Sequence, residues 1–322
     1  MMVGFDPSSI DNWISVTGVI RSGTTFVGKV LSLPIQVDYI HEPFNGGYTL
    51  PDHTPFRPQY VRLSDESPDA QAFHEQLSKL FSYQFGLPTT PNPKDPAFRK
   101  IIKSILGSRG PFYLRLAKLN PFHTAAIIKD PLSKLATEFM YHHFDVTPVI
   151  LVRHPASLAA SLKRVGWWPD LTDFKKHPRL VEDYFADEPD FLRRSWHSPL
   201  LESMAHWRAT YKFLLAQANS YSDWHVVTHE ELSDQPIRTF RTLYEALDLP
   251  WSSSVARSIQ QLTQGSGAGE AQEGKVMDLD RESSKIFELR RDSLSVEERR
   301  AIFDVVHDVA LKIYSRESFN ID

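Results

Sequence analysis

The sequence has no cysteine among its 322 residues. Disulfides, thiolate zinc sites, iron–sulfur clusters and a cysteine nucleophile are therefore excluded. No apolar run approaches the roughly 20 residues needed to span a bilayer. The N-terminal stretch MMVGFDPSSIDNW lacks the basic and apolar regions of a signal peptide. We therefore expect a cytoplasmic protein with no membrane span.

Several functional signatures are also missing. There is no G-x-S-x-G nucleophile elbow and no H-E-x-x-H zinc spacing, which argues against an α/β hydrolase and a zinc peptidase. The net charge is −4, so the surface as a whole attracts neither nucleic acid nor acidic membranes. Any anion site must therefore be local, and no nucleic-acid partner is expected.

What is present is an alternation of short apolar runs with longer helical patterns. The expected strands are 13–19, 37–41, 125–129, 148–152 and 224–228. The expected helices are 24–33, 70–85, 132–144, 156–165, 200–220, 236–247 and 295–314. Near-continuously apolar strands separated by helices predict an α/β fold. Its central parallel sheet should have about five strands, with helices on both faces.

Two regions rich in proline and aromatic residues, 46–125 and 166–199, interrupt this alternation. Both follow strands, so both can lie over the carboxyl edge of the sheet, where α/β proteins bind ligands. We interpret residues 1–322 as a single domain in which these two inserts cover a substrate pocket.

The stretch SVTGVIRSGTTFVGKVL, residues 15–31, has the spacing of a phosphate-binding loop. Gly18 and Gly23 allow a tight path between a strand and a helix. Backbone N–H groups and the helix dipole would then converge on an anion. Thr24 stands where such loops have lysine, and a base occurs three residues earlier, at Arg21. The alternative is an ordinary turn with a capping hydroxyl.

The missing lysine separates two kinds of chemistry. A kinase or NTPase needs that lysine on the β- and γ-phosphates, together with a metal ion held by an aspartate. The strand at 148–152 is followed by Arg153, and the strand at 224–228 by His229 and Glu230. The pattern therefore favours a group transfer without magnesium and without a γ-phosphate.

RSGTTF, residues 21–26, resembles the 5′-phosphosulfate loop of sulfotransferases that use 3′-phosphoadenosine 5′-phosphosulfate (PAPS). The motifs are most similar to those of the tyrosylprotein, carbohydrate and related bacterial sulfotransferases. The resemblance implies a three-layer P-loop fold, with Arg21 neutralising charge on the bridging oxygen as the sulfuryl group leaves. It also implies the following donor-binding residues: Arg21, Ser22, Gly23, Thr24, Thr25 and Phe26.

A second motif, VILVRHPASLAASLKR, places Arg153 at the end of a strand and Ser161 eight residues later on a helix. The two side chains could converge on one phosphate. Taken alone, an Arg–carboxylate pair and a serine bonded to its own backbone explain them better. The spacing is similar to the 3′-phosphate signature of the same family, which implies that Arg153 and Ser161 bind the 3′-phosphate.

A base is needed where an acceptor loses its proton, and a carboxylate or histidine can take that role. Glu42 follows the strand at 37–41 and precedes a proline, as in the tyrosylprotein and carbohydrate branches, so the resemblance implies a general base. His41 is the second candidate, but strand alternation predicts that the two side chains face opposite ways. We expect this strand to neighbour the strand before the loop.

The K-D-P sequence beginning at Lys129 also resembles the tyrosylprotein branch. There such a lysine stabilises charge on the transferring sulfuryl group. Asp130 is expected to cap the following helix. The plainer alternative for Lys129 is a pair with a carboxylate.

The C-terminal region carries the remaining candidates. Ser284 is a candidate catalytic contact, and the basic residues proposed around the 3′-phosphate and adenine are Arg281, Lys285, Arg290 and Arg291. The RKGxxGDWK string of the cytosolic sulfotransferases is absent. Ser295 and Glu298 have the spacing of a capping box. Trp167 and Trp168 are candidates for lining a pocket.

Together these observations predict an enzyme, a PAPS-dependent sulfotransferase. It would move the sulfuryl group to an acceptor hydroxyl, or less readily an amine, by in-line displacement. The product nucleotide would be adenosine 3′,5′-bisphosphate (PAP), and no metal is expected. The acceptor would be a small molecule or a glycan. Two alternatives stay open: a P-loop nucleotide kinase or NTPase, and a non-catalytic PAP-binding module.

Overall fold

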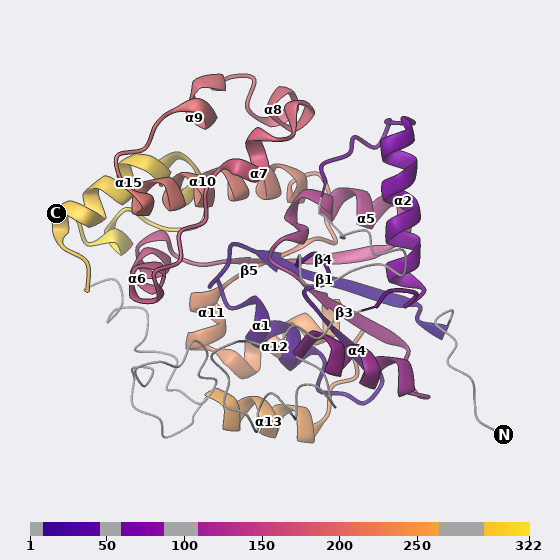
Figure 1. The fold of residues 1–322 in the computed structure, drawn as a ribbon. Coiled ribbons are helices and arrows are strands. Elements are labelled where there is room, and N and C mark those ends of the chain that lie inside the picture. Colours follow the sequence, from indigo (N-terminus) through magenta and orange to yellow (C-terminus); the bar gives the residue numbers. More distant parts are fainter. Residues whose placement is uncertain (1–8, 46–58, 87–108, 264–292) are drawn as a thin grey trace, which may run out of the picture. The chain divides into compact units, whose positions relative to one another are not determined.

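The computed structural model describes residues 9–45, 59–86, 109–263 and 293–322 (Figure 1). In them a five-stranded sheet has the order β2-β3-β1-β4-β5. The strands are β1 (Asn12–Gly18), β2 (Val37–His41), β3 (Ala125–Lys129), β4 (Val146–Val152) and β5 (His225–Thr228). The sheet is parallel. The predicted α/β fold with a parallel sheet of about five strands is confirmed.

One expectation about strand order is wrong. Strand β2 does not neighbour β1, because β3 lies between them and pairs in parallel with both. In this register Lys129, the last residue of β3, is aligned with Val16 of β1 and with His41 of β2. The carboxyl ends of the three strands therefore lie at one edge of the sheet, with Lys129 on the middle strand.

Each of the seven predicted helices has a counterpart in the structure. The described α-helices are α1 (Thr24–Leu31), α2 (Pro68–Phe81), α4 (Arg109–Leu119), α5 (Thr137–Phe144), α6 (Pro155–Val165), α7 (Thr172–Lys175), α8 (Pro178–Tyr184), α9 (Pro189–Arg193), α10 (Pro199–Ala218), α11 (His229–Asp234), α12 (Pro236–Ala246), α13 (Ser253–Thr263) and α15 (Val296–Ala310). Two 3₁₀-helices, η2 (Ser133–Ala136) and η3 (Glu317–Phe319), complete the elements. The helix predicted over 132–144 is thus divided into η2 and α5. Six described helices, α4, α7, α8, α9, α11 and α13, were not predicted.

The capping box at the start of α15 is confirmed. The backbone N–H of Glu298 donates to Ser295 Oγ over 3.2 Å, and that of Ser295 donates to Glu298 Oε2 over 3.0 Å. Each bond satisfies a backbone donor that an uncapped helix end leaves open. Ile302, Val306 and Val309 then form the buried side of the helix.

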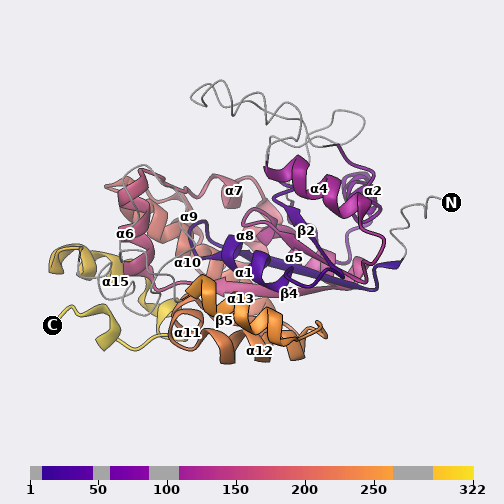
Figure 2. The same cartoon turned by 90° about the horizontal axis from the view of Figure 1, so that it is seen from below.

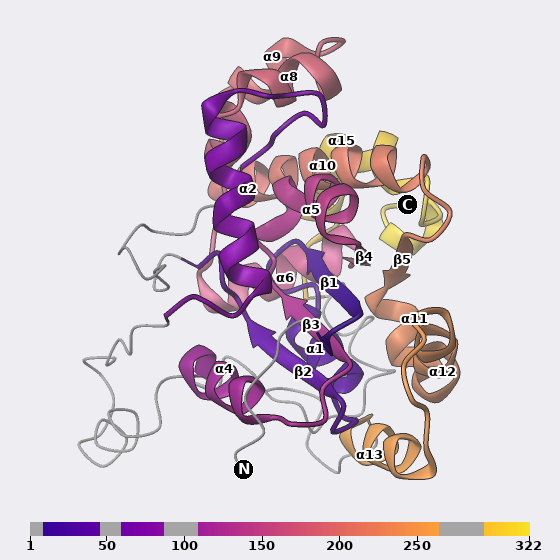
Figure 3. The same cartoon turned by 90° about the vertical axis from the view of Figure 1, so that its right-hand side faces the viewer.

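By packing, the chain divides into two compact units. The first comprises residues 1–17 and 27–149, and the second residues 18–26 and 150–322. In the first unit, α4 lies along β2, and α2 packs beside α5 (Figure 3). Its core contains apolar side chains from strands and helices, including Trp13, Ile40, Phe73, Leu77, Ile128 and Phe139. Each fully buried side chain of this kind contributes about 1.5–3 kcal/mol.

The second unit is organised around α10, which contacts both α6 and α15 (Figure 1). Trp207, Tyr211 and Phe213 on this helix are fully buried. A helix that is buried on most of its sides is typical of a central packing element. In the same unit α12 packs against both α11 and α13 (Figure 2).

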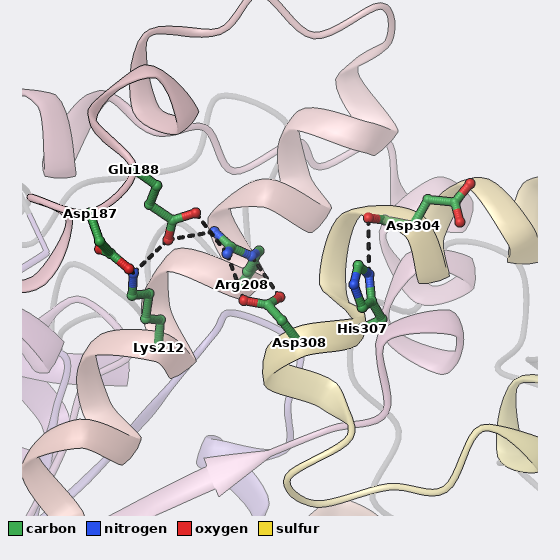
Figure 4. Close-up of polar contacts among 7 residues, drawn as sticks. All are labelled: Asp187, Glu188, Arg208, Lys212, Asp304, His307 and Asp308. Carbon is green, nitrogen blue, oxygen red and sulfur yellow. Dashed lines mark hydrogen bonds and ion pairs between the residues drawn. The ribbon is translucent and has the colours of Figure 1, made fainter.

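An ion-pair network ties the segment before α9 to α10 and α15 (Figure 4). Arg208 donates to Glu188 over 2.9 Å and to both carboxylate oxygens of Asp308 over 2.8 and 2.6 Å. Lys212, one turn further along α10, donates to Asp187 and Glu188. This bidentate, shared geometry is the kind that makes partly exposed ion pairs contribute measurably to stability. It holds part of the predicted insert 166–199 against the helical core of this unit.

The two inserts remain interpreted as covers of a substrate pocket, which is a prediction. Within the described residues, every helix is too short or too polar to cross a lipid bilayer.

Candidate functional site

The turn between β1 and α1 follows a path that requires glycine at two positions. Gly18 has φ 145°, and a Cβ there would lie 2.3 Å from the carbonyl oxygen of Leu151. Gly23 has φ 103°, and a Cβ would lie 3.1 Å from the ring of His229. Arg21, between them, also has a positive φ of 69°. The backbone can therefore fold back tightly before α1 begins.

Helix α1 starts at Thr24, the position where the phosphate-binding spacing predicts lysine. Thr24 and Thr25 are buried in its first turn. A helix N-terminus with open N–H groups and hydroxyls is a binding site for anions. Ser22 is used inside the turn, since its Oγ donates to the Val19 carbonyl over 2.6 Å. Phe26 packs its ring against Phe240 at 5.8 Å between centroids.

The two predicted phosphate motifs meet in the second unit. Arg153 directly follows β4, and its Nη1 donates to the backbone carbonyl of Arg21 over 2.8 Å. Arg21 Nε donates to Ser161 Oγ on α6 over 3.4 Å. Arg153 also donates to Ser157, through Nε over 3.2 Å and Nη2 over 3.0 Å. Ser157, one turn before Ser161, was not among the predicted residues.

The charge of buried Arg153 is influenced by a half-buried carboxylate, Glu230, that the sequence did not assign to the site. Burial lowers the pKa of Arg153 to about 10, and the negative charge of Glu230 opposes that shift. Glu230 Oε1 accepts from the His154 backbone N–H over 3.2 Å, and its Oε2 accepts from the Tyr314 hydroxyl over 2.9 Å. Burial raises the pKa of Glu230, although Arg153 acts against this. With a pKa of about 10, Arg153 stays charged at neutral pH.

Tyr211 supports the turn from α10. Its hydroxyl accepts from the Val19 backbone N–H over 3.2 Å and donates to the Leu151 carbonyl. Burial raises its pKa far above neutrality, so the hydroxyl keeps its proton. The sequence placed this residue on a helix but offered no signal that its hydroxyl would hold the loop.

Trp167 lies beside Arg21, and its pocket-lining role stays a prediction. The guanidinium carbon of Arg21 is 5.7 Å from the centroid of the Trp167 ring, within the range of a cation–π contact. Gly166 ends α6 with φ 67°, and the Trp167 N–H then donates to the Leu162 carbonyl over 3.2 Å. This is the left-handed helix ending that favours glycine, and it sets the position of the indole.

The predicted base and its partner belong to the first unit. Lys129 is almost fully buried and donates from Nζ to Glu42 Oε1. Asn45 Nδ2 donates to the other carboxylate oxygen over 3.1 Å. Burial raises the pKa of Glu42, but the charges of Lys129 and His41 more than offset this, so the pKa lies below its ordinary value. Glu42 is thus ionised at neutral pH.

The expectation that His41 and Glu42 face opposite ways is wrong. His41 Nε2 lies 3.9 Å from Glu42 Oε1. Glu42 has φ 51°, in the left-handed region, so the chain leaves the strand conformation there and the alternation of side chains ends. The other ring nitrogen of His41, Nδ1, is 2.9 Å from the Tyr39 hydroxyl, two residues earlier on the same face.

Asp130 does not cap the next helix as predicted. Its two oxygens accept from the backbone N–H groups of Phe44 and Leu132 over 2.7 and 2.8 Å. It therefore joins the segment after β2 to the turn after β3, while η2 begins without a side-chain cap. Burial, followed by the nearby charge of Glu42, raises the pKa of Asp130 to about 7.

Some predicted residues lie outside the described part of the chain, namely Ser284, Arg281, Lys285, Arg290 and Arg291. Within residues 9–45, 59–86, 109–263 and 293–322, no three His, Asp or Glu side chains are grouped so as to hold a metal ion.

Comparison with known proteins gives one family match. A family model described as "Sulfotransferase family" matches residues 14–253. A search of curated proteins gave no match. Sulfotransferase STF9 from Mycobacterium avium is 13% identical over 92% of this chain and 76% of that chain, with a TM-score of 0.43. Mouse sulfotransferase SULT7A1 complexed with PAP is 12% identical over 96% and 88%, with a TM-score of 0.41. Retinol dehydratase in complex with androsterone and inactive cofactor PAP is 13% identical over 94% and 81%, with a TM-score of 0.46.

Proposed function

Because the chain belongs to the sulfotransferase family, we propose that it moves the sulfuryl group of PAPS to an acceptor hydroxyl and leaves PAP. An amine is the second candidate acceptor. The observation that carries the proposal is the meeting of two motifs distant in sequence. Arg21 bonds to Ser161, and Arg153 bonds to the carbonyl of Arg21. A buried arginine beside a glycine-bent turn is suited to a nucleotide with several phosphate groups.

We assign the donor-binding roles to the second unit. The N-terminus of α1 and the side chain of Arg21 would bind the 5′-phosphosulfate, with Ser22, Gly23, Thr24, Thr25 and Phe26 forming the turn. Arg153 and Ser161 would bind the 3′-phosphate. The charge of Arg153 favours this role, since its hydrogen bonds go to the neutral acceptors Ser157 Oγ and the Arg21 carbonyl. Ser284 stays a proposed contact.

We assign proton transfer to Glu42. As the acceptor oxygen bonds to sulfur, the bond from sulfur to the bridging oxygen breaks and the acceptor proton moves to the carboxylate. Lys129 would stabilise the negative charge on the equatorial oxygens of the sulfuryl group. Arg21 would stabilise the negative charge on the leaving phosphate. A carboxylate with a lowered pKa is a weak base. It suffices here because the acceptor hydroxyl becomes acidic only as its bond to sulfur forms. His41 is the second candidate base.

The first experiment compares ligands by thermal shift. PAP should raise the melting temperature at micromolar concentration, and ATP with magnesium should not. A shift with ATP and magnesium alone would instead establish the kinase or NTPase alternative. The variant Arg153→Met should abolish the PAP shift, because it removes the charge without removing the side-chain volume.

The second experiment screens hydroxyl and amine acceptors with labelled PAPS, and then tests the base. Glu42→Gln should lower kcat by about 10²- to 10⁴-fold, the usual contribution of a general base, with the Kd for PAP unchanged. His41→Asn should lower kcat far less. If His41→Asn lost turnover and Glu42→Gln kept it, the base assignment would pass to His41. A protein that binds PAP but turns over no acceptor would be the non-catalytic module. The cytoplasmic location and the small-molecule or glycan acceptor stay predictions.

A further inference from the structure

One side of α4 in the first unit is apolar and exposed. Phe112, Leu116 and Leu119 recur at intervals of four and three residues, so they share one face of the helix. All three are exposed, and Leu119 is 78% exposed. Leu114 and Ala117 on the other side are buried, where α4 packs along β2 (Figure 3). Helix α4 is thus apolar on its outer face as well as on its inner one.

The exposed surface continues beyond the helix. Asn120 Nδ2 donates to the Ile35 carbonyl over 2.9 Å, and its Oδ1 accepts from the Phe122 N–H over 3.0 Å. Asn120 therefore brings the chain around Ile35 next to the end of α4, and the side chains of Ile35 and Phe122 are both exposed. The apolar face of α4 is defined here as these five residues: Ile35, Phe112, Leu116, Leu119 and Phe122. Large apolar side chains that are exposed close together are typical of an interaction surface.

The surroundings of this face are basic. Helix α4 contains Arg109, Arg115 and Lys118 and no Asp or Glu, a net charge of +3 in a chain whose total is −4. Among them Arg115 is exposed on α4. From α1, the ammonium of Lys29 lies 5.8 Å from the centroid of the Tyr113 ring on the same helix. The surface around α4 is therefore positive, although the chain as a whole is negative.

We propose that the apolar face of α4 docks on the surface of an anionic phospholipid membrane. Leucine and phenylalanine enter the boundary between headgroups and acyl chains, while flanking lysine and arginine pair with anionic headgroups. Each basic residue near such a surface contributes roughly a fivefold increase in binding. The docking is peripheral and needs no membrane-spanning helix.

Charge distinguishes a membrane from two other partners for the apolar face of α4, namely a second copy of the chain and residues 87–108. A symmetric dimer would place the same surface of two copies together, and so would bring two positive patches into contact. Residues 87–108 of the chain carry four Lys or Arg and one Asp by sequence, so they too would add positive charge to a positive helix. An anionic bilayer would bury the apolar side chains and would also supply negatively charged headgroups to the basic ones.

The experiment is co-sedimentation of the full chain with lipid vesicles. One set is pure phosphatidylcholine, and the other also contains the anionic lipid phosphatidylglycerol, at roughly 30 mol%, which gives the bilayer a negative surface potential. The protein should bind the anionic vesicles, and binding should fall steeply when salt is raised, because salt screens the headgroup attraction. Leu116→Ser should lower the partition constant by about tenfold, the contribution expected for one inserted leucine.

Matched controls come from the second unit. Leu311 is 48% exposed and Leu116 is 50% exposed, so Leu311→Ser makes the same chemical change elsewhere and should leave binding unchanged. Arg115→Glu should weaken binding, whereas Arg257→Glu, at an exposed position on α13, should not. No binding to anionic vesicles, or equal losses for Leu116→Ser and Leu311→Ser, would overturn the proposal. Concentration-dependent dimerisation that Leu116→Ser abolishes would assign the face to a second copy instead.

Discussion

The pair formed by Lys129 and Glu42 offers a sharp test, because one change should alter both stability and its pH dependence. Lys129→Met keeps the unbranched aliphatic stem, which packs closely against Gly28, and removes only the ammonium. Glu42 then keeps its burial but loses the cation that holds its pKa down. We expect the pKa of Glu42 to rise above its ordinary value in the variant.

The magnitude follows from the exposure of the two partners. Breaking a fully buried ion pair costs about 3–5 kcal/mol. The Lys129 side chain is 1% exposed, but that of Glu42 is 24% exposed, so solvent screens part of the freed charge. We therefore expect Lys129→Met to lower the free energy of unfolding at pH 7 by about 1–3 kcal/mol.

The sign of the pH dependence is also determined. In the wild type the pKa of Glu42 is depressed, so the pair stabilises the fold above the unfolded pKa and loses this effect as pH falls through the folded pKa. In Lys129→Met the unpaired carboxylate destabilises the fold until it is protonated. The difference between the two proteins should therefore be largest near pH 7 and shrink toward pH 4.

Urea unfolding at a series of pH values measures this difference. The double variant Lys129→Met with Glu42→Gln serves as control, because it removes both charges and should recover most of the lost stability. A Lys129→Met protein as stable as the wild type at pH 7, or a difference that grows on acidification, would refute the electrostatic reasoning.

Four further predictions concern the second unit. Arg153→Lys keeps the charge but not the planar fork that makes three hydrogen bonds, so calorimetry should show PAP binding about 10- to 100-fold weaker; unchanged affinity would remove Arg153 from the site. Gly18→Ala should lower the free energy of unfolding by about 3 kcal/mol or more, since its Cβ would meet the Leu151 carbonyl. Gly166→Ala, in open space, should cost about 1 kcal/mol in the same denaturation assay. Tyr211→Phe should cost about 1–3 kcal/mol, because a buried N–H loses its acceptor, and an equally stable variant would show that water replaces the hydroxyl.

Local patterns in the sequence predicted all five strands and seven of the thirteen described α-helices. The strands at 37–41 and 125–129 agree with the structure to the residue, because each run rich in apolar residues ends at a polar side chain, His41 or Lys129. The capping box of Ser295 and Glu298 could also be predicted from the sequence, since both of its hydrogen bonds lie within a four-residue segment. Arg21 and Arg153 were singled out by residue type and spacing, and their phosphate-binding roles, which the family resemblance implies, stay predictions.

Contacts between distant segments were not readable in the same way. Tyr211 holds a loop almost 200 residues away, and no local pattern distinguishes such a tyrosine from one that only packs. The negative charge of Glu230 offsets part of the effect of burial on the pKa of Arg153, yet in sequence Glu230 is an ordinary acidic residue near a strand end. Asp130 carried a capping signal, but its second bond, to the Phe44 N–H, comes from a segment 86 residues earlier.

The sequence by itself therefore determined the α/β class, the glycine-bent turn after β1, and a loop that has Arg21 but no lysine at position 24. Each of these depends on backbone conformation or residue chemistry within a short window. Only the tertiary structure decided that β3 lies between β1 and β2, and that a left-handed residue turns Glu42 toward His41 and Lys129. Strand order and side-chain pairing depend on the packing free energy of the whole chain, and no short segment contains that information.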